Sequence, residues 1–183
     1  EESIKYFNLS GIGKSPSKLD MERILSINEH YIKKLDEKDL YNELMIFSEK
    51  YKSKIDIKYE KNLVKSISFL KNKAKKLEDI YQNAQYIIKE KIEIDELDLK
   101  LIDNTSKQLL NDFLNEYEQI ENINKEKLEK IIKKLIDKYK INFKGIGQPL
   151  RITLTGSKFG PGIYDIIMSL DKSEVIKRLK MIN

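Results

Sequence analysis

The sequence predicts an all-α protein, a helical bundle of two subdomains that follows a short irregular N-terminal segment. Residues 17–144 contain none of the seven glycines and none of the three prolines. Turns draw on both residue types for their special dihedral angles, so a long stretch without them favours helices joined by short polar turns. Apolar residues in this stretch also recur every three or four positions, which is typical of one helical face.

The apolar spacing divides the middle of the chain into successive helices. The expected faces are Ile24, Leu25, Ile27, Tyr31 and Ile32; Leu40, Leu44 and Phe47; Leu63, Ile67 and Leu70, followed by Leu77, Ile80, Tyr81, Ala84 and Ile87; Leu109, Leu110, Phe113, Leu114 and Tyr117; and Leu128, Ile131, Ile132, Leu135, Ile136 and Tyr139. Ser17 to Asp20 forms a predicted capping box, and Asp36 and Asn124 are predicted N-caps. The pattern leaves residues 90–103 unassigned and predicts a junction near residues 118–124.

Most breakers lie in one window near the C-terminus, GIGQPLRITLTGSKFGPGI at residues 145–163. We expect Pro149 to start a short helix that contains Arg151 and ends at Gly156, and Pro161 to open the next. The stiff loop between them would expose backbone amides at a helix N-terminus, which suits a phosphate or an unstacked base. An ordinary helix–turn–helix junction is the alternative interpretation.

Composition excludes several classes of function. The chain has no cysteine and a single histidine, His30, so disulfides, thiolate chemistry and a histidine-rich zinc site are excluded. Neither a P-loop nor a dinucleotide fingerprint is present, and no apolar run approaches the roughly 18 residues that cross a bilayer. We therefore predict no catalytic, cofactor-binding or metal-binding residue. The formal net charge of +5 fits an anionic partner without proving one.

Two segments resemble one family of enzymes. LRITLTGS at residues 150–157, followed by GPGIYDI at residues 160–166, resembles the LR-x-ALTG…PG-[IL] signature near the C-terminus of bacterial glutamyl-tRNA synthetases. SPSKLD at residues 15–20, followed by INEHYI at residues 27–32, is similar to the segment that comes after the catalytic core in that family. The two matches occur in the family's order, although Thr153 replaces the usual alanine.

The resemblance implies that this chain is the anticodon-binding C-terminal region of a class I synthetase. HIGH-like and KMSKS-like motifs are absent from the sequence, so we expect recognition here and catalysis elsewhere. The parent enzyme would be a cytoplasmic, monomeric glutamate–tRNA ligase that uses ATP and Mg²⁺ to join glutamate to tRNA(Glu). This region itself would hold no cofactor. Its expected partners are the tRNA and the N-terminal catalytic domain, and whether tRNA(Gln) is also charged stays open.

The resemblance also implies a domain division and a set of contact residues. Residues 1–33 would end the stem-contact region, residues 34–120 would form the first helical anticodon-binding subdomain, and residues 121–183 the second. The tRNA-binding residues implied are Arg151, Gly160, Pro161, Ile163 and Lys73. Arg151 would read the third anticodon base, because its planar fork of donors can pair with a base edge and stack on its face.

Each of these residues also has a plainer interpretation. Arg151 would otherwise form a surface ion pair, and the Gly160–Pro161 stretch would be an ordinary turn. Lys73, which matches a first-base position approximately, would belong to the solvated face of a lysine-rich helix with Lys71, Lys75 and Lys76. The competing function for the whole chain is a helical protein-interaction module with a generic basic surface.

Overall fold

The computed structural model describes residues 2–11 and 18–182, and every regular element in that part of the chain is a helix. The all-α prediction is therefore confirmed. The elements are α1 (Glu2–Tyr6), η1 (Leu9–Gly11), α2 (Met21–Lys34), α3 (Glu37–Tyr51), η2 (Ile57–Tyr59), α4 (Glu60–Leu70), η3 (Lys71–Lys73), α5 (Leu77–Asn83), α6 (Gln85–Ile88), α7 (Glu96–Leu99), α8 (Asn104–Glu118), α9 (Lys125–Tyr139), α10 (Phe143–Thr155), α11 (Ile163–Ser169) and α12 (Lys172–Lys180). Among the described helices, none is both long and apolar enough to cross a membrane.

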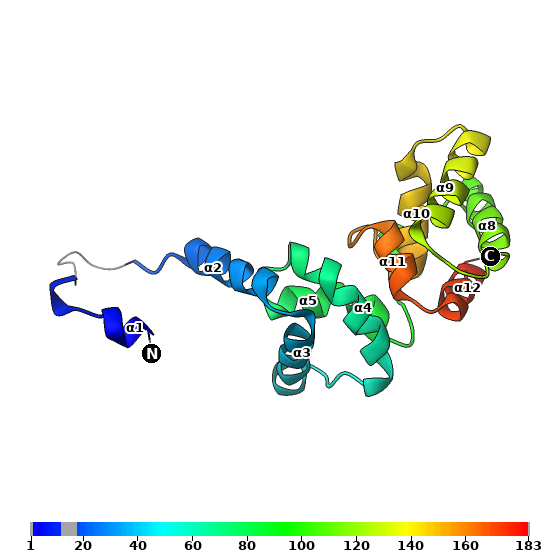
Figure 1. Cartoon of the computed structure of the whole chain (residues 1–183). Helices are drawn as coiled ribbons and strands as arrows, with labels where there is room; N and C mark the ends of the chain where they lie inside the picture. The colour runs from blue at the N-terminus through cyan, green and yellow to red at the C-terminus, as the bar shows by residue number, and fades with distance from the viewer. Residues whose placement is uncertain (1, 12–17, 183) are drawn as a thin grey trace.

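The helices pack as two groups that meet at α4 and α11 (Figure 1). In the first group α3 packs against α4 and α5, while α2 extends from it as an arm. In the second group α8 packs against α9, α10 and α12. Helix α11 contacts α4 of the first group as well as α9 and α10 of the second. The segment between α10 and α11 therefore lies close to the boundary between the two groups.

Local capping chemistry fixes where several helices begin. The Asp36 carboxylate accepts the backbone N–H of Lys38, and the Asn124 amide oxygen accepts that of Lys127, so both predicted N-caps are confirmed. The cap of α2 is Asp20, which accepts the backbone N–H of Arg23 at 3.1 Å. Ser17 of the predicted capping box lies outside the described residues, as do Ser15 and Pro16 of the N-terminal motif.

The predicted apolar faces differ in how much they bury. Leu40, Leu44, Leu63, Ile67 and the apolar faces of α8 and α9 lie in one continuous core. The face of α2 does not, because Ile32 is the only residue of that helix that is buried. Ile24, Ile27 and Tyr31 are 42 %, 51 % and 59 % exposed. Periodicity correctly predicted a helix there but not what covers it.

Helix α10 begins six residues before the predicted start at Pro149. Asn142 is its N-cap, accepting the backbone N–H of Gly145 at 3.0 Å, and Pro149 lies inside the helix. Proline cannot donate to the carbonyl of Gly145, four residues earlier, which ordinarily weakens a helix. Here the buried side chains of Ile146, Leu150 and their neighbours hold α10 in the core, so tertiary packing outweighs the missing bond.

Candidate functional site

The loop at residues 156–162 joins α10 to α11 and has a fixed backbone at both ends. Gly156 is the C-cap of α10, as predicted, with φ of +82°, and its N–H donates to the carbonyl of Ile152 at 2.8 Å. A Cβ at Gly156 would meet the backbone carbonyl of Glu93 closer than real Cβ atoms approach, so only glycine fits. Gly162 is the N-cap of α11, which begins at Ile163 rather than at the predicted Pro161.

Arg151 braces this loop from the last turn of α10. Its Nε donates to the carbonyl of Pro161 and its Nη1 to the carbonyl of Lys158, both at 3.2 Å. The side chain is half-buried, and within the described residues no carboxylate pairs with it. Arg151 is therefore neither sunk in the core nor engaged in the surface ion pair considered above. Nη2 and one Nη1 proton remain to donate outward, and one face of the guanidinium plane is available for stacking.

A second brace comes from the segment that sequence patterning left unassigned. Asp98 on α7 is 6 % exposed, and its Oδ2 accepts the backbone N–H of Lys158 at 2.8 Å. Its Oδ1 lies 3.1 Å from the Lys158 ammonium. The backbone N–H and then the ammonium hold the pKa of the Asp98 carboxyl below its ordinary value, against the opposing effect of burial. Nothing in the acidic and apolar pattern of residues 90–103 indicated that Asp98 would support a loop sixty residues later.

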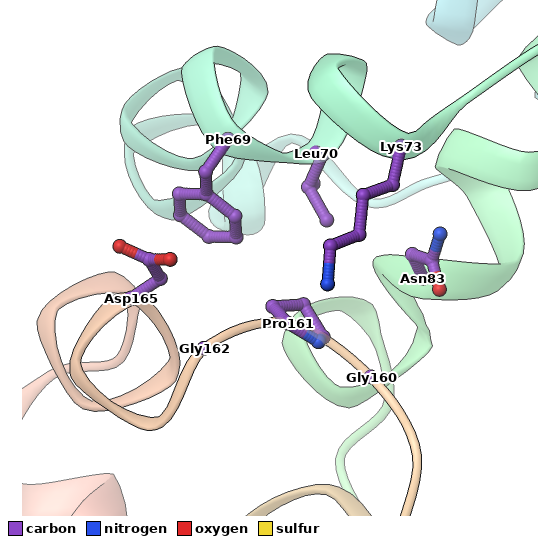
Figure 2. A pocket seen from close by; sticks show the side chains of 8 residues that line it. All are labelled: Phe69, Leu70, Lys73, Asn83, Gly160, Pro161, Gly162 and Asp165. Carbon is purple, nitrogen blue, oxygen red and sulfur yellow. The ribbon is translucent and has the colours of Figure 1, made fainter.

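A cleft of about 220 Å³ lies between this loop and the first group of helices, and it brings three predicted residues together (Figure 2). Lys73 extends from η3 toward Pro161, with Gly160 beside it. Asn83 and Asp165 also line the cleft, which gives it an amide and a carboxylate as well as an ammonium. These are the polar groups that recognise the edges of unstacked bases.

The four lysines of the η3 region occupy different environments. Lys71 donates its ammonium to the carbonyl of Leu35 at 3.1 Å, which ties η3 to the end of α2. Lys73 alone of the four lines the cleft, whereas Lys75 and Lys76 are exposed outside it. The Asp79 carboxylate accepts the backbone N–H groups of Lys75 and Lys76. The geometry thus separates Lys73 from neighbours that the sequence could not distinguish.

Arg151 and Ile163 stand apart from that cleft. Arg151 lies across the loop from Lys73, beside Phe143, Gln148 and Phe159, in a neighbouring cavity of about 320 Å³. Ile163 is 1 % exposed and packs in the core at the start of α11, so its side chain supports the loop from beneath. In residues 2–11 and 18–182 no cluster of His, Asp or Glu side chains is placed to hold a metal ion.

Comparison with known proteins agrees with this geometry. The profile of the family described as "Anticodon binding domain" matches residues 31–182. The chain is 56 % identical over 179 residues to a glutamate–tRNA ligase of Pelagibacter ubique, which covers 98 % of this chain. It is 31 % identical over 184 residues to glutamate–tRNA ligase 2 of Rickettsia prowazekii, covering 99 % of this chain. It spans only 38 % of the length of each relative.

A solved structure shares the fold along almost the whole chain. The glutamate–tRNA ligase of Elizabethkingia meningosepticum, in complex with its amino acid, superimposes with a TM-score of 0.80 at 21 % sequence identity. The match covers 99 % of this chain and 36 % of that one. The helical architecture is therefore one that a glutamate–tRNA ligase also contains.

Proposed function

This chain belongs to the anticodon-binding domain family, and from that premise we propose that it is the anticodon-recognition region of a glutamate–tRNA ligase. The observation that carries the proposal is the loop at residues 156–162. Arg151, through its bonds to the carbonyls of Lys158 and Pro161, holds this loop against a cleft that contains Lys73, Asn83 and Asp165. Such a site offers fixed polar groups to bases that have left the stack, which is how single-stranded RNA loops are recognised.

In this proposal Arg151 reads the third anticodon base with the donors that the loop does not use. Nε and Nη1 hold the loop carbonyls, so Nη2 and the remaining Nη1 proton pair with the base while the guanidinium plane stacks on it. Because two of its nitrogens are already bound, the guanidinium loses little conformational freedom when the RNA arrives. Lysine at this position would supply charge without the fork.

The remaining predicted residues divide between contact and support. Lys73 holds the RNA near the first anticodon base, chiefly through phosphate, because an ammonium is a point charge. Gly160 and Pro161 form the loop surface on which a splayed base packs. Ile163 anchors that surface from the core, where it is 1 % exposed.

The activity of the complete enzyme is part of the proposal. It would join glutamate to tRNA(Glu) in two ATP- and Mg²⁺-dependent steps in the cytoplasm as a monomer, with the catalytic domain as the partner of this region. The 56 % identity to a glutamate–tRNA ligase supports this assignment. The division into subdomains also stays a proposal, and the packing of α8 on α9, α10 and α12 favours a boundary before Asn104 instead of at residue 120.

The test is a titration of the chain with two forms of tRNA(Glu), the native one and one with the third anticodon base replaced, at one fixed salt concentration. We expect the replacement to weaken binding to the wild-type chain, and Arg151→Ala to cost about 1–3 kcal/mol for the native tRNA only. Equal weakening of both RNAs by Arg151→Ala would leave Arg151 a phosphate contact. Equal affinity of the wild-type chain for both RNAs would refute anticodon recognition and favour a generic basic surface.

A further inference from the structure

The cavity beside Arg151 has a composition that the anticodon-reading role of Arg151 does not require. It measures about 320 Å³ and lies on the opposite side of the loop from the Lys73 cleft. Its lining contains the two phenyl rings of Phe143 and Phe159 and three cationic side chains, those of Lys144, Arg151 and Lys158, with no carboxylate. We call this cavity the phenylalanine slot.

The two rings are exposed, yet the backbone or ring of each is held by its surroundings. Phe143 is 44 % exposed, and its ring packs on the Cα face of Gly147 and at 5.9 Å from the ring of Tyr164. Phe159 is 74 % exposed at the tip of the loop, where its backbone N–H donates to the Ser157 hydroxyl at 3.1 Å. Pre-positioned aromatic faces of this kind lower the ordering cost of binding a flat ligand.

The polar groups of the slot match a nucleotide. Lys144, Gln148 and Arg151 follow one another at spacings of four and three residues, so they share one face of α10. Within the described chain no protein group is hydrogen-bonded to the Gln148 amide, which carries both a donor and an acceptor for a base edge. Lys144 has no carboxylate partner among the described residues, and its charge suits the adjoining phosphate.

We propose that the phenylalanine slot binds a second unstacked nucleobase of the anticodon loop, next to the base that Arg151 contacts. The base stacks on Phe159, with Phe143 forming the other wall, and Gln148 hydrogen-bonds to its edge. This inference rests on the proposed function, because it needs an RNA loop at the site. It adds specificity-determining residues that neither the sequence motifs nor the signature loop contain.

The test uses anticodon stem-loop RNAs in which each loop nucleotide in turn is abasic, titrated against wild-type and Phe159→Leu chains. For the wild-type chain, we expect removal of one base other than the third anticodon base to weaken binding by about 5- to 100-fold, the range of one base–aromatic stack. Phe159→Leu should weaken binding of the intact RNA by a similar factor. It should then bind that one abasic RNA no worse than the intact RNA. Gln148→Leu should change which base is preferred at the same position.

Tyr51→Leu is the matched control, since Tyr51 is another exposed aromatic side chain (61 % exposed) on α3 and lines neither cavity. It should leave the abasic pattern of the wild-type chain unchanged. The slot assignment is overturned when Phe159→Leu keeps the wild-type pattern, or when it weakens every RNA equally. In either case anticodon-dependent binding by the wild-type chain would still support the proposed function. Loss of all base dependence in the wild-type chain would overturn both.

Discussion

Replacing Asp98 tests whether the loop at residues 156–162 is held from α7. Asp98→Ala removes the acceptor of the Lys158 backbone N–H, at 2.8 Å, and the ion pair with the Lys158 ammonium, at 3.1 Å. A hydrogen bond to a charged group contributes about 1.5–3 kcal/mol, and the variant also leaves the N–H unsatisfied. The Lys158 side chain is 35 % exposed, so its ion pair adds at most about 1 kcal/mol after screening. We expect Asp98→Ala to lower the free energy of unfolding by about 2–3 kcal/mol.

Lys158→Ala is the matched control, because it deletes the ammonium and leaves the backbone N–H bonded to Asp98. Urea unfolding followed by far-ultraviolet circular dichroism compares the three chains under one set of conditions. The control should cost no more than about 1 kcal/mol. Equal losses for the two variants would show that the exposed ion pair, and not the backbone hydrogen bond, fastens the loop, and our account of this brace would then be wrong.

The pH dependence of the Asp98 contribution has a defined sign. The pKa of the Asp98 carboxyl is lowered in the folded chain from its ordinary value of 3.8, first by the Lys158 N–H and less by the ammonium. A depressed pKa stabilises the folded state fully above the unfolded value, and this stabilisation is lost as pH falls through the folded value. The difference in stability between wild type and Asp98→Asn should therefore be constant near neutral pH and shrink below about pH 3.8.

Two further predictions concern buried hydroxyls and the salt dependence of binding. The hydroxyls of Thr153 and Tyr117 are buried without a hydrogen-bond partner in the described structure, and burial raises the pKa of Tyr117 to about 12. Thr153→Val and Tyr117→Phe should each raise stability in urea by about 1 kcal/mol, and a loss instead would reveal a bound water that satisfies the hydroxyl. For RNA binding, Lys73→Ala should reduce the slope of log K against log salt by about 0.7, the value for one single-strand phosphate. The exposed Lys61 on α4 supplies the control, and an unchanged slope for Lys73→Ala would contradict a phosphate contact.

Where a local rule decided the structure, the sequence was sufficient to predict it. Asp36 and Asn124 cap their helices because a short acceptor side chain precedes an amphipathic run. Gly156 ends α10 because the left-handed conformation there excludes a Cβ. Each of these outcomes depends on a few neighbouring residues.

Where long-range packing decided the structure, sequence reasoning failed or stopped. Pro149 was placed at a helix start because that is its usual position, but burial of α10 keeps it in the interior. Residues 90–103 showed no clear period, because α7 is a four-residue helix held by the loop that it supports. For the site, the motif pointed to Arg151 and the Gly160–Pro161 turn. It gave no indication of Asp98 or of the Phe143 ring, which meet the loop only in three dimensions.

The bracing of the loop bears on how discrimination between bases would arise. A guanidinium that is free to move can follow a wrong base and recover part of the lost hydrogen bonding, so it discriminates weakly. Arg151 cannot do so without releasing the carbonyls of Lys158 and Pro161, and Lys158 is held in turn by Asp98. A mismatched base therefore leaves desolvated donors unpaired, which is the costly outcome. By this reasoning Asp98, which lines neither cavity around the loop, contributes to base selectivity as well as to stability.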